Sequence, residues 1–92
     1  MPPGEKRIRS VVVDDSTDFM HAICSFLENL PKVIVVAKCR SGRDAVALDH
    51  DWILDLVLMD VRMPDVTGLE ATSELTRALP SVVVILMSAF EE

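Results

Sequence analysis

The stretch LVLMDVRMPDVTG, residues 56–68, decides the fold that we expect for this chain. Its first four residues are apolar, and a short run that is apolar on both faces is typical of a strand buried between two layers. The strand must give way to a loop near Met63, because Pro64 pushes the residue before it out of the α-helical region. Asp60 therefore lies at the carboxyl end of a central strand, where open α/β sheets bind their ligands.

The rest of the chain alternates similar apolar runs with segments of helical pattern. Strands are expected at 8–13, 33–39, 56–60 and 81–88, and helices are expected after Ser16, after Ser41 and after Thr67. Strands that are separated by helices pair in parallel through right-handed crossovers. The sequence therefore predicts an α/β fold, a doubly wound parallel sheet with helices on both faces.

Local signals set the ends of the first and third helices. Ser16 is a good N-cap, and Thr67 with Glu70 three residues later makes a capping box. Pro31 and Pro80 stop these two helices. In the first helix, apolar residues recur at three- and four-residue steps, which predicts one apolar stripe made of Phe19, Ile23, Phe26, Leu27 and Leu30.

Size and composition indicate one small globular domain. The chain has 92 residues, and 50% of them are hydrophobic, too many for a disordered segment. The net charge of −6 argues against a nucleic-acid or membrane surface on this domain. No apolar run approaches the roughly eighteen residues of a membrane span, and no signal peptide is evident. We expect a cytoplasmic protein with reduced Cys24 and Cys39 and a flexible tail at residues 1–7.

The last expected strand leaves the sheet without a cover at one edge. Residues 82–87 are apolar on both faces, as in a central strand, yet no further strand follows before Glu92. Completing such a sheet would take another helix, strand and helix, roughly 35 residues by typical element lengths. Either residues 8–92 are an incomplete domain or a second copy covers the edge, so we expect self-association through the strand from Val82 to Met87.

Three carboxylates converge in the predicted sheet. Asp14 and Asp15 follow the first strand and Asp60 ends the third, and these strands can be neighbours. Two unit charges about 4 Å apart repel by ~4 kcal/mol at an effective dielectric of about 20, so three together need a cation or a proton. With no paired His or Cys ligands, the donors predict a hard metal, Mg²⁺ before Ca²⁺. Such a site invites phosphate chemistry, and Ser88 could add a hydroxyl to the same rim.

The motifs at these strand ends resemble those of a known family. VVDDS at residues 12–16, LMDVRMPDVTG at 58–68 and MSA at 87–89 are similar to the response-regulator receiver domain of two-component signalling. The resemblance runs from Ile8 to Glu92 in the family's order and spacing. It implies a flavodoxin-like receiver fold with three α/β/α layers, here lacking the last helix, strand and helix.

The resemblance also implies a role for each site residue. Asp60 would accept a phosphoryl group from a phosphohistidine on a sensor histidine kinase, which makes the domain a signalling switch rather than an enzyme. Asp15, Asp60 and the backbone carbonyl of Arg62 would hold Mg²⁺, and Asp14 would bind it through water. Ser88 would hydrogen-bond the phosphoryl group and carry the signal across the sheet.

Other features of the family bear on how this chain would work. The family's lysine and aromatic switch residue would lie beyond Glu92, so we expect residues 1–92 alone to be poorly phosphorylated by acetyl phosphate. Arg62 and Phe90 flank the pocket, and the resemblance implies that these positions tune the access of water to the acyl phosphate. Family members often append a DNA-binding output domain, so any DNA contact would come from a domain absent here.

Other interpretations remain open at the level of the sequence. Asp14 and Asp15 could be a solvated strand end and a helix cap, and Ser88 could be only a local cap. A second hypothesis is a Mg²⁺-dependent phosphohydrolase with an aspartate nucleophile, although such enzymes typically carry Asp-x-Asp where this chain has adjacent aspartates. A third hypothesis is a receiver that is not phosphorylated and serves as a dimerising module.

Overall fold

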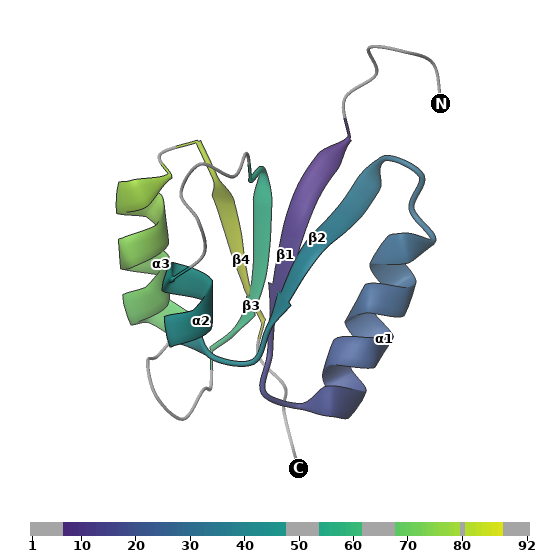
Figure 1. Cartoon of the computed structure of the whole chain (residues 1–92), viewed down its shortest axis with the longest axis horizontal. Coiled ribbons are helices and arrows are strands. Elements are labelled where there is room, and N and C mark those ends of the chain that lie inside the picture. Colours follow the sequence, from purple (N-terminus) through teal and green to yellow (C-terminus); the bar gives the residue numbers. More distant parts are fainter. Residues whose placement is uncertain (1–6, 48–53, 62–67, 80, 88–92) are drawn as a thin grey trace.

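The computed structural model describes residues 7–47, 54–61, 68–79 and 81–87. Four strands and three helices alternate along these residues (Figure 1). The strands are β1 (Ile8–Val13), β2 (Val33–Cys39), β3 (Leu56–Asp60) and β4 (Val83–Met87). The helices are α1 (Thr17–Glu28), α2 (Gly42–Val46) and α3 (Gly68–Ala78). This is the order that the sequence predicts.

The described strands form one parallel sheet in the order β2-β1-β3-β4. Helix α1 covers one face of the sheet, and α2 and α3 cover the other, which gives three layers (Figure 1). The chain moves from β1 to β2 in one direction and then crosses to β3 and β4 on the other side of β1. This reversal brings the carboxyl ends of β1 and β3 side by side, and it confirms the predicted doubly wound α/β fold.

The apolar strands are buried from both faces, as predicted. Next to α2 and α3, the core contains Val11 and Val13 of β1, Val57 and Met59 of β3, and Ala71 and Leu75 of α3. Next to α1, the core contains Val12 of β1 with Met20, Cys24 and Leu27 of α1. Since successive strand residues point to opposite faces, a strand that is apolar throughout needs a packed layer on each side.

The buried face of α1 differs from the predicted stripe. The buried side chains are Met20, Cys24 and Leu27, and Ile23 packs partly against them. Phe19, Phe26 and Leu30 are instead 37%, 64% and 37% exposed. The predicted stripe was therefore wrong for these three residues. The helix carries two neighbouring apolar rows with the same spacing, and periodicity alone did not choose between them.

One contact with β2 indicates how α1 is oriented on the sheet. The Nζ atom of Lys38 on β2 lies 4.0 Å from the Oε1 atom of Glu28, so this flank of α1 faces the β2 edge of the sheet. At 100° per residue, Phe19 and Phe26 fall on the helix flank opposite Glu28. They therefore lie toward β3 and β4, where none of the described helices covers the α1 face of the sheet.

Strand β4 forms an edge of the described sheet, although its sequence is typical of a central strand. Val84 and Leu86 pack against the core beneath α2 and α3. Val83 and Ile85 alternate with them and are 58% and 46% exposed. The described sheet thus leaves apolar side chains of β4 in contact with water.

The two cysteines are free and buried, and they belong to core clusters on opposite faces of the sheet. Burial raises the pKa of the Cys39 thiol to about 11, and the negative charge of Asp44 adds to this rise. Burial also raises the pKa of Cys24, which the charge of Lys38 partly offsets. Both thiols are therefore protonated at neutral pH, in agreement with the expectation of reduced cysteines.

None of the helices in the described part of the chain combines the length and the apolar character that crossing a membrane requires. The predicted tail at residues 1–7 lies, apart from Arg7, outside the described residues. The capping box predicted at Thr67 lies outside them too, so both stay predictions.

Candidate metal centre

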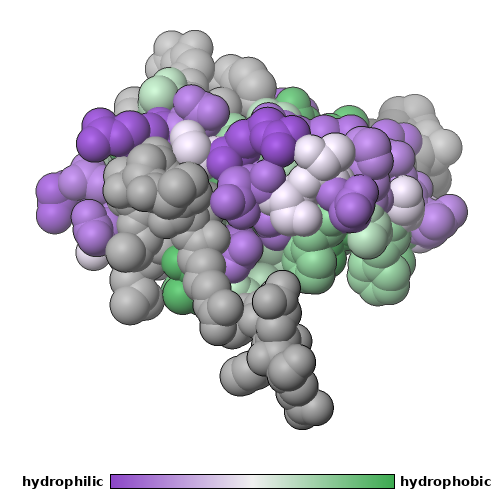
Figure 2. All heavy atoms as spheres, turned by 90° about the horizontal axis from the view of Figure 1, so that it is seen from below, coloured by the Kyte–Doolittle hydropathy of each residue, from purple (hydrophilic) through white to green (hydrophobic). Residues whose placement is uncertain are grey.

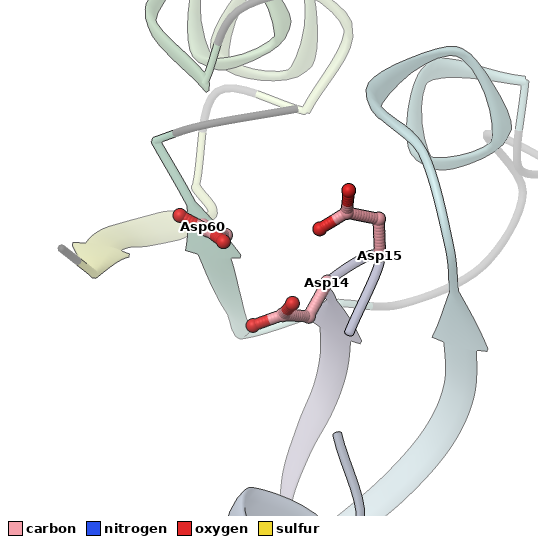
Figure 3. Close-up of side chains that lie close together, drawn as sticks. All are labelled: Asp14, Asp15 and Asp60. Atoms are coloured by element: carbon pink, nitrogen blue, oxygen red, sulfur yellow. The ribbon is translucent and has the colours of Figure 1, made fainter. Parts of the chain in front are cut away.

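The three aspartates predicted to converge do lie together at the carboxyl ends of β1 and β3 (Figure 3). Asp14 directly follows β1, and Asp60 is the last residue of β3. Parallel pairing of β1 with β3 sets these two strand ends next to each other. One carboxylate oxygen from each of Asp14, Asp15 and Asp60 lies within 4.8 Å of the others.

Figure 2 looks onto this end of the molecule, from below the view of Figure 1. Hydrophilic residues dominate the described surface there, and hydrophobic residues gather to one side. Among the three aspartates, Asp15 is exposed, Asp60 is half-buried and Asp14 is buried. The cluster therefore reaches from the core to the solvent, so that a cation can approach it.

Asp14 is a buried carboxylate, 1% exposed. Its Oδ1 atom accepts a hydrogen bond from the Ser16 N–H at 2.9 Å, which fixes the turn between β1 and α1. Its Oδ2 atom is buried and has no hydrogen-bond partner among the described residues. Burial raises the pKa of this carboxyl above 3.8, the Ser16 N–H lowers it, and the charges of Asp60 and Asp15 raise it.

The backbones around the cluster are held by the sheet and by one side chain. Asp14 N–H donates to the Cys39 carbonyl at 2.9 Å, and Val61 N–H donates to the Met87 carbonyl at 2.9 Å. The Asp15 carbonyl accepts a hydrogen bond from the guanidinium of Arg40 at 2.8 Å. The three carboxylates are therefore presented by a largely fixed frame.

The arrangement fits a hard divalent cation. All three groups are carboxylates, and oxygen donors of this kind suit Mg²⁺, Ca²⁺ or Mn²⁺. A buried polar atom without a partner is costly, and a cation near Asp14 Oδ2, bound directly or through a water molecule, would satisfy it. A cation would also relieve the repulsion among the three charges. Acidic clusters are common on protein surfaces, so the buried Asp14 oxygen is the feature that distinguishes this one.

Three predicted site residues, Arg62, Ser88 and Phe90, lie outside the described residues, and their roles stay predictions. Sequence reasoning missed Arg40. Its position in the sequence could have revealed it: Arg40 directly follows β2, and β2 ends beside the carboxyl end of β1. A cation at that point stands next to the acidic turn that follows β1.

Comparison with known proteins identifies relatives over most of the chain. The family model described as the response regulator receiver domain matches residues 11–92. The response regulator protein VraR from Staphylococcus epidermidis is 36% identical over 85 residues, which is 92% of this chain and 41% of that protein. VraR from Staphylococcus aureus is 35% identical over the same length. The chain thus spans about two fifths of the length of these relatives.

Solved structures give the same answer for the fold. The signal receiver domain of the response regulator NarL from Mycobacterium tuberculosis matches with a TM-score of 0.84 and 29% identity, over 95% of this chain and 70% of that one. The response regulator domain of CheB from Thermotoga maritima matches with a TM-score of 0.82 and 29% identity, over 90% of this chain and 61% of that one. Together with the family match over residues 11–92, these comparisons show that the chain belongs to the response regulator receiver domain family.

Proposed function

We propose that this chain is the phospho-accepting module of a two-component response regulator and that Asp60 is the acceptor. One observation carries the proposal: three carboxylates converge within 4.8 Å, and one of their oxygens is buried without a partner among the described residues. Membership of the receiver family supports the same role for the cluster.

The proposed reaction transfers a phosphoryl group from a phosphohistidine of a sensor histidine kinase. One carboxylate oxygen of Asp60 attacks the phosphorus, and the new O–P bond forms as the P–N bond breaks. The electron pair of the broken bond returns to the imidazole nitrogen, which takes up a proton. Asp60 suits this role because it is half-buried at a strand end, so its backbone is fixed while a donor can still reach its carboxylate.

Mg²⁺ is the cofactor that we propose for this site. Asp15, Asp60 and the backbone carbonyl of Arg62 would hold it directly, and Asp14 would bind it through water. When bound, the ion neutralises charge on the carboxylates and on the transferring phosphoryl group. The unpaired, buried oxygen of Asp14 supports a cation at this position independently of the family.

Three residues outside the described part of the chain complete the proposal. Ser88 would donate a hydrogen bond from its hydroxyl to the phosphoryl oxygens and so transmit phosphorylation to the rest of the domain. Arg62 and Phe90 would limit the access of water to the acyl phosphate and lengthen its lifetime. On a complete receiver, Arg62→Ala should therefore speed dephosphorylation, and an unchanged rate would count against this role.

The partners follow from the same proposal. A sensor histidine kinase would supply the phosphoryl group, in the cytoplasm, where buried reduced thiols such as Cys24 and Cys39 are stable. Because the chain spans 41% of the VraR relatives, an output domain and any contact with DNA would belong to residues outside this chain.

A receiver that is not phosphorylated and acts as a dimerising module is the alternative. The exposed Val83 and Ile85 on edge strand β4 favour it. The intact set of Asp14, Asp15 and Asp60 argues against it, since a purely structural module would not keep three converging carboxylates at a free-energy cost.

Labelling with acetyl phosphate tests the proposed function. The chain is incubated with acetyl phosphate and Mg²⁺, the acyl phosphate is reduced with borohydride, and the modified residue is located by mass spectrometry. We expect weak, Mg²⁺-dependent modification at Asp60 alone, lost in Asp60→Asn and kept in Asp18→Asn, a control at an exposed aspartate outside the cluster. Modification at other aspartates, or none in the unaltered chain, would contradict the proposal. Stoichiometric modification would contradict the expectation of poor phosphorylation.

A further inference from the structure

We propose that Arg40 is a positioning residue for the candidate metal centre, which holds the turn carrying Asp15 in place. This inference rests on the proposed function, because it concerns the same carboxylates. The Nη2 group of Arg40 donates a hydrogen bond to the backbone carbonyl of Asp15 at 2.8 Å. The bond links the end of β2 to the acidic turn after β1, across 25 positions of sequence.

The arginine projects from a fixed part of the backbone. Cys39, the residue before it, is the last of β2, and its carbonyl accepts the Asp14 N–H at 2.9 Å. Ser41, the residue after it, caps α2, and its hydroxyl oxygen accepts the Asp44 N–H at 3.1 Å. Arg40 is exposed, but its anchored neighbours fix the point from which its side chain reaches the Asp15 carbonyl, so it can link the two elements as a brace.

Asp15 is the member of the cluster that most needs such a brace. Asp14 is buried and hydrogen-bonded to the turn, and Asp60 belongs to β3. Asp15 is exposed and lies between the end of β1 and Ser16, the N-cap of α1. Packing therefore restrains its position least, and the bond to its carbonyl restrains the peptide that carries it. Groups that orient metal ligands from outside are needed for full affinity.

The direction in which metal affinity changes when Arg40 is removed distinguishes a positioning role from a purely electrostatic one. A guanidinium close to an acidic site repels a divalent cation, so removing its charge should strengthen metal binding if charge is all that matters. If Arg40 instead holds Asp15 in the binding geometry, removing it should weaken metal binding. These two effects are opposite, so the direction of the change identifies the role.

The test compares Arg40→Gln, Arg40→Lys and the control Arg43→Gln in the whole chain. Arg43 is an exposed arginine on α2, so its substitution removes the same charge without removing the bond to Asp15. Mg²⁺ affinity is measured by calorimetric titration, and backbone amide hydrogen exchange at Ser16 is measured without metal. For Arg40→Gln we expect about a three- to tenfold loss of Mg²⁺ affinity. Removing a residue that hydrogen-bonds a metal ligand typically costs about ten- to hundredfold, and the loss here should be at or below the small end of that range. We also expect faster exchange at Ser16.

Arg40→Lys should recover part of the affinity, and Arg43→Gln should leave it unchanged or slightly stronger. Equal or tighter Mg²⁺ binding by Arg40→Gln would overturn the inference, as would an equal loss in Arg43→Gln. If the unaltered chain binds no Mg²⁺, the proposed metal site fails, and hydrogen exchange then decides about the brace alone. Faster exchange at Ser16 in Arg40→Gln would support the brace, and unchanged exchange would overturn it.

Discussion

Asp14 shows how a single residue can favour function over stability. Its carboxyl is buried, and its pKa is raised by that burial, lowered by the Ser16 N–H, and raised by the charges of Asp60 and Asp15. A carboxyl whose pKa is higher in the folded state contributes stability that is fully present below the unfolded pKa. That contribution is lost as the pH rises through the folded pKa. Ionising Asp14 therefore costs stability in the metal-free protein.

Asp14→Asn should make the metal-free protein more stable at pH 7, by on the order of 1 kcal/mol. The amide keeps an oxygen for the Ser16 N–H and gains an N–H₂ group that can donate to the neighbouring carboxylates. Urea unfolding with EDTA measures the gain, which should shrink as the pH is lowered towards 4. The control Asp18→Asn should show no such gain. A loss of stability at pH 7 in Asp14→Asn would contradict this account of the cluster.

The convergence of the three aspartates could be predicted from the sequence, because parallel strands end at the same edge of a sheet. The burial of Asp14 and the contact of Arg40 with the Asp15 carbonyl could not be predicted. Both depend on the direction of one side chain within a turn, and no periodic pattern encodes that direction.

At the scale of elements, α1 shows that local sequence determines where a helix begins and ends, whereas packing determines which of its faces is buried. Its start at Ser16 and its end before Pro31 were predicted from local chemistry, and both are confirmed. Its buried face was predicted only in part. Leu27 is buried and Ile23 packs partly against the core, as predicted, but the sheet buries Met20 and Cys24 in place of the predicted phenylalanines. The large Phe26 is left 64% exposed.

Two alanine substitutions test this orientation of α1. Leu27→Ala should lower the free energy of unfolding by about 2–3 kcal/mol, since it removes a side chain that is 6% exposed from the core. Phe26→Ala, although it deletes a larger group, should cost less than about 1 kcal/mol because most of that group is already in water. Urea unfolding of both variants gives the comparison. A larger loss for Phe26→Ala would show that Phe26 is buried, as the sequence predicted.

At the scale of the whole molecule, the two faces of the described sheet are covered unequally. Two helices cover one face, while α1 alone covers the other, over β1 and β2 (Figure 1). The alternation of elements and the doubly wound sheet could be predicted from the sequence, since short connections allow few arrangements. The uncovered edge at the last strand could be predicted too, because no further strand follows it in the sequence, and β4 does lie at an edge of the described sheet although its apolar sequence is typical of a central strand.

Self-association is the expected consequence for residues 1–92. An edge strand with exposed Val83 and Ile85 offers unpaired backbone groups and apolar surface to a second copy. Light scattering at micromolar concentration should therefore give a mass above that of one chain. Ile85→Lys should restore the monomer, whereas Ser73→Lys, at an exposed position of α3, should not. A strictly monomeric mass for the unaltered chain would refute this prediction.

Titration with Mn²⁺ tests most directly the central claim that Asp14, Asp15 and Asp60 form one cation site. The free ion is followed by electron paramagnetic resonance in the unaltered chain, in Asp60→Asn and in Asp18→Asn, with Mg²⁺ as competitor. We predict one Mn²⁺ per chain, displaced by Mg²⁺, unchanged in Asp18→Asn and weakened at least about tenfold in Asp60→Asn, because a direct carboxylate ligand is lost. Equal binding by Asp60→Asn and the unaltered chain, or no binding by either, would contradict the claim.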